Sequence, residues 1–437
     1  MITLAGLAAA LLTAQAPAEI RMLPAEPTDS ALGADLTVYL LTFDPGEIVW
    51  ERFGHNALLI RDNRSGRDVA FDYGRFDFGR TFGDQLRFVG RFARGLMDYS
   101  MGAGSGDAYF RAYTAADRSI WSQELDLPAA ARGRLQRFLL WNMREENRVY
   151  RYNYYTDNCS TRIRDALDAV IGGQLQAWAD TIRTDMSYRD HTRRTTENDP
   201  FMYTALMLGL GRPTDRPITA WKAMFLPIEL RPYLDRLVVT DPDGRVHPLV
   251  RESRHVVEND RFSVAERPHD WTGGYLAVGG LLGMALGLLG VLGRRGSGWR
   301  LAFGSAAAAW AFFAGVGGLL LAFLWALTDH RFSYGNENVL QLNVISLLLA
   351  FVLPSALWRS RTRLPLATRL AAAVVIVSAA GLLLNLIGGV QSNRDMIAFL
   401  LPIHTGLLLG LKAIGAGTVS GPGPVAEADR LSRRRVA

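Results

Sequence analysis

The chain has 437 residues, of which 49% are hydrophobic and 21% charged, and its formal net charge is +6. From Gly273 onward, 14 Lys and Arg residues stand against 5 Asp and Glu, so the basic surplus belongs to the apolar half of the chain. Membrane topology accounts for that surplus, which therefore gives no support to nucleic-acid binding. The single cysteine excludes a disulfide within the chain. We find no nucleotide-binding loop, zinc-ligand spacing or internal repeat, and expect neither a metal nor a cofactor.

The N-terminus has the pattern of an export signal. Ile2 to Leu12 is an apolar run too short to cross a bilayer, and small residues at 14, 16 and 18 offer cleavage sites. We therefore predict a signal peptide over residues 1–16, although the sequence leaves its cleavage open. Residues 17–33, rich in Ala, Pro and Glu, are expected to be a tether. An exported domain then follows over residues 34–270.

The exported domain begins with period-2 patterns typical of strands. Leu36–Phe43 predicts a buried strand, and His55 stands at the start of a second strand that continues through Ala57–Ile60. After a turn, Asp68–Tyr73 predicts its hairpin partner. Because the two ends meet in an antiparallel pair, we expect His55 and Asp72 to be close neighbours.

The middle of this domain is less regular. Phe76–Ser105 has no clean period and is predicted to be a long covering segment and a candidate part of a substrate groove. Ile120–Leu127 predicts a strand, and Pro128 opens an amphipathic helix that runs to about Asn147. Leu237–Val250, with a central Asp-Gly pair, predicts a hairpin.

The only cysteine lies where a strand gives way to a helix. Val149–Tyr155 alternates like a strand, residues 163–170 have helical spacing, and Asp157 or Asn158 is a suitable N-cap. Cys159 is therefore predicted at a helix N-terminus, where the helix dipole favours an anion and makes the sulfur a better nucleophile. The alternative is a small buried hydrophobe, but the polar neighbours of Cys159 argue against it.

His55 is the best candidate among seven histidines for the base that activates Cys159. Asp72 is the candidate for orienting the imidazole, with Asn56 as its rival. A hydrogen-bonded histidine at the end of a sheet is the alternative interpretation of His55. The residues expected to support the catalytic group are Asn56, Asn158 and Tyr154.

Candidate substrate-binding residues come from three places. Arg162 lies in the first turn of the cysteine helix, and Arg183 begins a basic segment suited to phosphate headgroups or to solvent. His330, Asn336 and Glu337 belong to a polar and aromatic loop between two apolar segments. That loop is expected to dock the exported domain, to hold a lipid headgroup, or simply to cap the helices.

The remainder of the chain predicts an all-α membrane domain over residues 271–416 and a basic tail over 417–437. Its five apolar segments of spanning length are Gly273–Gly293, Leu301–Leu327, Val339–Trp358, Leu370–Val390 and Met396–Ala416. Arginines gather in alternate loops and in the tail, so these parts and the C-terminus are expected in the cytoplasm. The exported domain then lies on the periplasmic side of a bacterial inner membrane, which agrees with the signal peptide.

Together, these stretches resemble Lnb-type lipoprotein N-acyltransferases, most clearly their N-terminal periplasmic domain. The matching motifs are Phe53-Gly54-His55, Phe71-Asp72-Tyr73-Gly74, Tyr154 through Thr161, Phe225-Leu226-Pro227 and Tyr334 through Asn343. The order of histidine and cysteine is similar to that of permuted NlpC-type thiol enzymes, including lecithin:retinol acyltransferases. The resemblance implies an α+β papain-like domain followed by an all-α domain of five transmembrane helices. Where the family often has Asn, this chain has Asp72, which leaves the third catalytic group open.

The resemblance also implies an activity. Cys159 would take a fatty acyl chain from a membrane phospholipid as a thioester and pass it to the N-terminal amine of a lipoprotein. Two other functions stay open, namely a membrane-anchored cysteine hydrolase, acting as a phospholipase or cell-wall amidase, and a non-catalytic receptor or assembly factor. The donor headgroup, the chain length, the acceptor and the oligomeric state are not determined by the sequence.

Overall fold

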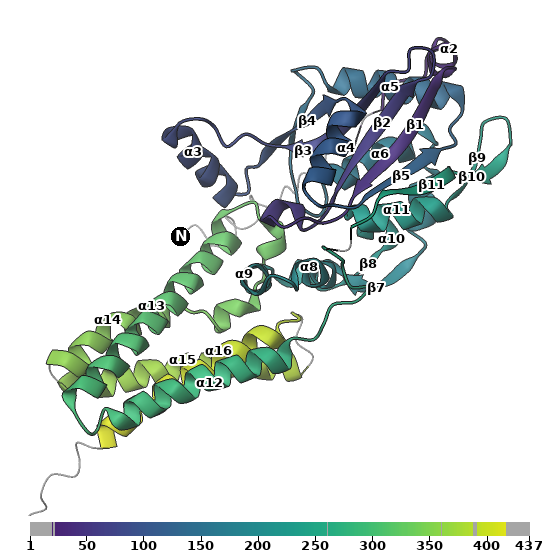
Figure 1. Cartoon of the computed structure of the whole chain (residues 1–437). Coiled ribbons are helices and arrows are strands. Elements are labelled where there is room, and N and C mark those ends of the chain that lie inside the picture. Colours follow the sequence, from purple (N-terminus) through teal and green to yellow (C-terminus); the bar gives the residue numbers. More distant parts are fainter. Residues whose placement is uncertain (1–19, 21, 260, 360, 388–390, 417–437) are drawn as a thin grey trace, which may run out of the picture. The chain divides into compact units, whose positions relative to one another are not determined.

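The computed structural model describes residues 20–416 apart from residues 21, 260, 360 and 388–390. The predicted signal peptide (1–16) and basic tail (417–437) lie outside the described residues. Contacts group the chain into two compact units (Figure 1). The sheet unit comprises residues up to 198 together with 216–267, and the helical unit comprises residues 199–215 together with those from 268 onward.

The sheet unit is built on one seven-stranded antiparallel sheet of order β11-β5-β1-β2-β3-β4-β6. Its strands are β1 (Leu36–Phe43), β2 (His55–Asp62), β3 (Asp68–Arg75), β4 (Asp98–Gly104), β5 (Ile120–Leu125), β6 (Val149–Arg151) and β11 (Val250–Val257). The predicted strand β1 and the predicted hairpin of β2 and β3 are confirmed, with Ala57 opposite Asp72. The alternation of apolar side chains in these strands gives the sheet two buried faces.

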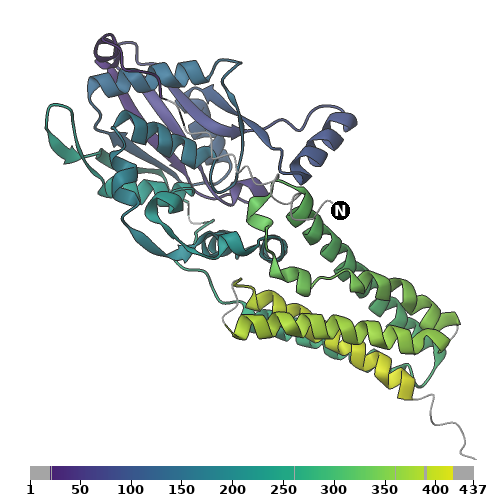
Figure 2. The ribbon, with the colours of Figure 1, turned by 180° about the vertical axis from the view of Figure 1, so that it is seen from behind.

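Helices cover both faces of this sheet. They are α2 (Asp29–Gly33), α3 (Phe82–Ala93), α4 (Gly106–Ala115), α5 (Ala129–Asn142), α6 (Cys159–Val170), α7 (Gln174–Ala179), α8 (Tyr188–Thr196), α10 (Ala220–Ala223) and α11 (Pro227–Arg236). Leu40 and Leu58 pack with residues of α5, α6 and α11 in one core, whereas Leu41 and Phe43 pack with α4 on the other face. Figure 1 shows α4 on the near face, and Figure 2 shows the opposite face from behind.

Two short sheets complete the unit. β9 (Val238–Thr240) pairs with β10 (Val246–Pro248), which confirms the predicted hairpin, and Gly244 takes the positive φ of 87° that its turn requires. β7 (Arg183–Ser187) pairs with β8 (Pro217–Thr219).

Two segments differ from the prediction. The predicted tether contains α2, which packs on α5. Arg137 Nε and Nη2 donate to the two carboxylate oxygens of the buried Asp29, each at 3.0 Å. This bidentate ion pair joins residues more than a hundred positions apart and has no local signal. The predicted covering segment Phe76–Ser105 instead contains α3 and the central strand β4.

The helical unit confirms the five predicted spans. Among the described residues, five helical stretches are long and apolar enough to cross a membrane: α12 (Thr272–Leu292), α13 (Ser297–Leu327), a broken span (Glu337–Trp358), α15 (Leu364–Leu386) and α16 (Arg394–Ala416). The broken span holds α14 (Ile345–Pro354), which Pro354 ends. The predicted fold class, an α+β unit followed by an all-α unit, is therefore confirmed.

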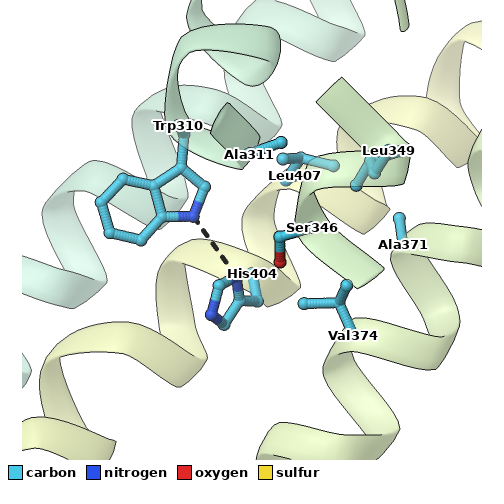
Figure 3. Close-up of a pocket in the computed structure, with 8 residues that line it drawn as sticks. All are labelled: Trp310, Ala311, Ser346, Leu349, Ala371, Val374, His404 and Leu407. Atoms are coloured by element: carbon cyan, nitrogen blue, oxygen red, sulfur yellow. Dashed lines mark hydrogen bonds between the residues drawn. The ribbon is translucent and has the colours of Figure 1, made fainter. Parts of the chain in front are cut away.

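The tightest pair in the bundle is α12 with α16. A Cβ atom added to Gly283 would lie 2.3 Å from the Pro402 carbonyl oxygen, and one on Gly406 would lie 1.9 Å from that of Gly283. Small residues thus let these two backbones touch, as is usual between helices in membranes. Inside the bundle, Figure 3 shows a small pocket where Trp310 Nε1 donates to His404 Nδ1 at 3.3 Å beside Ser346.

Candidate active site

Cys159 is the first residue of α6, as predicted. Asn158 caps the helix because its side-chain oxygen accepts from the backbone N–H groups of Ser160 and Thr161, both at 2.9 Å. Thr161 Oγ1 returns the interaction by accepting from the Asn158 N–H at 2.7 Å, which completes a capping box. The cap fixes the first turn of the helix, and Cys159 remains partly exposed there.

Asn158 also fixes the loop that leads to the helix. Its Nδ2 donates to the carbonyl oxygens of Tyr154 and Phe225, each at 3.0 Å. The predicted supporting role of Tyr154 therefore rests on its backbone carbonyl. Phe225 lies in the Phe225-Leu226-Pro227 motif of the resemblance, so this bond explains how that distant motif contributes to the cysteine loop.

Arg162 braces the same loop and is not free to meet a substrate. Its Nε and Nη2 donate to Asp157 at 2.6 and 2.9 Å, and its guanidinium lies 3.9 Å from the centroid of the Tyr150 ring. Both charged side chains are buried. The bidentate pair and the stacking together occupy the planar fork of Arg162, so its predicted role in substrate binding gives way to a structural one.

His55 opens β2 and lies on the face covered by α4. Its ring lies beside two aromatic rings that stack on each other, with the Phe43 and Tyr113 centroids 6.3 and 6.2 Å away. His55 Nε2 lies 3.1 Å from Asp72 Oδ2, and the two side chains are 17% and 9% exposed. The register explains this contact, because Asp72 faces Ala57 and is thus the diagonal neighbour of His55 on the same face.

Asp72 is held as an anion by a second partner. Arg75 Nε donates to Asp72 Oδ1 at 2.8 Å, and Arg75 Nη2 donates to the Tyr109 hydroxyl at 2.5 Å. Burial alone would raise the pKa of Asp72, but the hydrogen bond and charge of His55 and the charge of Arg75 lower it below its ordinary value. Asp72 therefore presents a carboxylate to the imidazole.

His55 and Cys159 meet at the end of the sheet. Burial alone would lower the pKa of His55, but the charges of Tyr113 and Cys159 and hydrogen bonds to Asp72 and Cys159 raise it well above its ordinary value. Because Nε2 faces Asp72, the ring nitrogen left for the sulfur is Nδ1. The three side chains predicted as a catalytic group are thus brought together.

Gly74 allows β3 to pass beside the cysteine. Its φ is 99°, a conformation that residues with a side chain rarely adopt, and the pairing of β3 with β4 shifts register there. A Cβ atom on Gly74 would lie 3.7 Å from the Cys159 Cβ. The glycine of the Asp72-Tyr73-Gly74 motif is therefore required by its backbone geometry.

Asn56 points to the opposite face from His55. Its Nδ2 donates to Ser160 Oγ at 3.1 Å, and Ser160 Oγ donates to the Met224 carbonyl oxygen at 2.8 Å. Asn56 thus ties the start of α6 to β2, and Asp72 is the residue that contacts His55.

The basic segment that begins at Arg183 is neither a headgroup site nor a solvated helix in its central part. Arg183 is exposed on β7, but Arg189 and His191 of α8 are fully buried. Arg194 Nη2 lies 3.0 Å from His191 Nδ1 and also donates to the Glu229 carboxylate. Burial and the charge of Arg194 lower the pKa of His191 to about 3, so this histidine is neutral in the fold.

The other three predicted substrate residues belong to the helical unit. Glu337 pairs with Arg212 at 3.0 Å, Asn336 Nδ2 donates to the Leu208 carbonyl oxygen at 2.7 Å, and His330 is buried. The structure therefore does not bring them into the unit that holds Cys159. Asn336 and Glu337 instead hold residues 199–215 against the bundle.

Sequence reasoning missed several neighbours of His55. Tyr113 stacks on the ring, and the buried Arg118 lies 4.6 Å from the Tyr113 centroid. Both come from a stretch in which we identified no motif. Arg75 had a signal, because it directly follows the Asp72 motif. Among the described residues, no group of three or more His, Cys, Asp or Glu side chains is arranged to hold a metal.

Fold and site together define a membrane protein whose N-terminal sheet-rich domain places a cysteine, a histidine and an aspartate side by side. Residues 25–194 match the family model of the Lnb N-terminal periplasmic domain, which confirms the predicted resemblance to the Lnb type. The matched range contains His55, Asp72 and Cys159 and ends within α8. No curated protein and no solved structure matches the chain.

Proposed function

We propose that this protein is a membrane-anchored thiol acyltransferase that moves a fatty acyl chain from a phospholipid to the N-terminal amine of a lipoprotein. One observation carries the proposal. Cys159, at the N-terminus of α6, interacts with a His55 whose other ring nitrogen contacts the Asp72 carboxylate, in an Lnb-type domain joined to five apolar helices. A nucleophile, its base and an orienting group are the parts that acyl transfer requires.

In the first step, His55 takes the proton of the Cys159 thiol. The thiolate attacks an ester carbonyl carbon of the phospholipid. The backbone N–H of Cys159, at the start of α6, is suited to stabilise the oxyanion, whereas those of Ser160 and Thr161 donate to Asn158. The ester C–O bond then breaks, and His55 returns its proton to the departing lysophospholipid oxygen. The product is an acyl thioester on Cys159.

In the second step, the acceptor amine attacks the thioester carbonyl carbon. The C–S bond breaks, the acyl chain becomes an amide, and the proton lost by the amine passes through His55 to Cys159. The raised pKa of His55 favours the protonated ring that forms when His55 takes the thiol proton, and Asp72 stabilises this imidazolium in each step.

The proposed function includes an orientation of the chain in the membrane. Arginines cluster in the loop between α12 and α13 and in that before α15, which favours the cytoplasm for both loops and for the C-terminus. The sheet unit would then lie in the periplasm, tethered to the inner membrane that contains its lipid donor.

The experiment is to supply the purified full chain, in vesicles of phospholipid with a labelled acyl chain, with a diacylated lipopeptide. We expect one labelled acyl group on the peptide amine. This product should be lost in Cys159→Ala and His55→Ala and kept in His255→Ala, which alters an exposed histidine of β11. Release of labelled fatty acid to water without amide formation would instead identify a hydrolase. Full activity of Cys159→Ala would exclude the proposed chemistry.

A further inference from the structure

Helix α3 exposes an apolar face. None of its residues is buried, and Figure 1 shows it standing apart from the sheet. Phe82, Leu86, Val89 and Phe92 are 80%, 63%, 56% and 47% exposed. Their spacing of four, three and three residues places them on one side of the helix. Four large apolar side chains thus form a continuous exposed stripe.

The other side of α3 is charged. Asp84 pairs with Arg87 at 3.3 Å, Arg91 pairs with Asp98 of β4, and the exposed Arg80 and Arg94 flank the helix. A helix with arginines on one face and Phe, Leu and Val on the other has the composition of helices that lie in a membrane surface.

The apolar stripe continues onto a second segment, the short helix η1 (Val49–Glu51). Val49 and Trp50 are both 57% exposed. The Trp50 ring packs on Phe76 and Phe78, at centroid distances of 5.9 and 6.3 Å, and Phe78 packs on Phe88 of α3 at 4.6 Å. We call the exposed set Val49, Trp50, Phe82, Leu86, Val89 and Phe92 the interfacial patch.

A row of aromatic rings connects this region with the cysteine. Phe76 lies 5.0 Å from Tyr99, and Tyr99 stacks on Tyr152 at 4.2 Å. Tyr152 and Cys159 line the same core cluster.

We propose that the interfacial patch inserts into the phospholipid bilayer and that the row from Phe76 to Tyr152 guides an acyl chain to Cys159. The bilayer is the occupant that fits best, because five apolar helices of the same chain keep this unit at a membrane. The exposed Arg80 and Arg94 at the two ends of the helix also complement anionic headgroups, whereas Arg87 is paired with Asp84. The role of the aromatic row rests on the proposed acyl transfer, whereas insertion of the patch does not.

Insertion can be tested in a chain that cannot perform the chemistry. Cys159 is the only cysteine, so Cys159→Ala with Leu86→Cys accepts one environment-sensitive fluorophore. The full chain is reconstituted in phosphatidylglycerol and phosphatidylcholine vesicles that carry nitroxides on their acyl chains. We expect strong quenching at position 86 and weak quenching for the control Arg87→Cys, on the charged face of the same helix. Equal weak quenching at both positions, or a shielded label at 86 that lipid nitroxides do not quench, would overturn insertion. The latter result would identify a protein partner or a second copy.

The link to Cys159 needs an activity readout. Phe82→Ser with Leu86→Ser should slow acyl transfer from vesicle phospholipid about tenfold or more. The same variant should leave thioester formation from a water-soluble short-chain ester unchanged, and the control Arg87→Ser should leave both rates unchanged. An unchanged vesicle rate, or an equal loss with both donors, would overturn the role in lipid access. If the parent chain transfers no acyl group at all, the proposed function fails while the quenching result still stands.

Discussion

Among the described residues, the buried polar cluster around Cys159 and that at the end of α9 (Pro200–Gly209) have opposite character. Around Cys159 the polar groups are ionisable, with the pKa of His55 raised and that of Asp72 lowered. In the helical unit, the cluster at the end of α9 is made mostly of amides. Asn338 Nδ2 donates to the Met207 carbonyl oxygen at 2.9 Å, and Gln391 Nε2 donates to that of Leu210 at 3.0 Å.

The difference between these clusters teaches how to separate chemistry from anchoring. Side-chain amides do not gain or lose charge by protonation near neutral pH. The amides of this cluster donate hydrogen bonds to the last carbonyl groups of a helix. The bonds of Asn393 to Asn338 and of Asn385 to Asn393, at 2.9 and 3.0 Å, extend the amide cluster. We conclude that it anchors α9 to the bundle, whereas the Cys159 cluster has the charged groups and the partly exposed cysteine that a reaction requires. The following predictions test this division.

The largest effect is expected at the histidine. His55→Ala removes the group that takes the thiol proton, so acyl transfer should fall about 10³-fold, within the range typical for a general base. The measurement is the rate of lipopeptide acylation in vesicles, with His255→Ala as the control. A loss of less than about tenfold would mean that His55 is not the base.

Asp72→Asn should have the next largest effect. The neutral amide loses the charge that stabilises the imidazolium, so we expect acyl transfer to fall by about 10 to 100-fold. The hydrogen bond to Asp72 is one cause of the raised pKa of His55, so this pKa should fall in the variant. The pH at which alkylation of Cys159 by iodoacetamide changes rate should therefore move to lower values. An unmoved profile would show that Asp72 only supports the strand.

Asn338→Leu should divide the two clusters most clearly. It leaves the Met207 carbonyl oxygen without its amide donor and removes one of the two amide donors to the Leu208 carbonyl oxygen, the other being Asn336, which should cost about 2 kcal/mol of stability. The measurement is thermal unfolding of the full chain in detergent. Alkylation of Cys159 should proceed at the parent rate. A strongly altered alkylation rate would show that the amide cluster also acts on the reactive site.

The smallest effect is expected for Asn158→Asp. The carboxylate still caps α6, but the donors to Tyr154 and Phe225 are lost, which should cost about 1 kcal/mol in thermal unfolding. The added negative charge beside Cys159 opposes the thiolate, so alkylation should slow several-fold. Faster alkylation in the variant would contradict the idea that the first turn of α6 favours an anion.

Local patterns were sufficient to predict the centre of the site. A period-2 alternation and a turn placed His55 and Asp72 on one hairpin, and the residues around Asn158 predicted the cap that carries Cys159. The five apolar spans followed from their length alone. In each case the physical cause lies within a short window of sequence.

What could not be predicted depends on distant partners or on interrupted patterns. Gly83, Gly90 and the arginines of α3 obscure its helical period, so the sequence predicts an irregular segment where the structure has an amphipathic helix. The guanidinium of Arg162 is a group that could bind an anionic substrate. Only the fold shows that it is paired with Asp157 instead. Helix α9 belongs to the helical unit because its carbonyl groups accept hydrogen bonds from amides more than a hundred residues downstream.

The most direct test of the central proposal is the intact mass of the full chain after incubation with phospholipid in the absence of an acceptor. We predict a gain of one fatty acyl group on Cys159, removed by hydroxylamine, absent in His55→Ala and retained in His255→Ala. A parent chain that produces acylated lipopeptide but never carries this adduct, or an adduct that forms equally well without His55, would contradict the thioester mechanism.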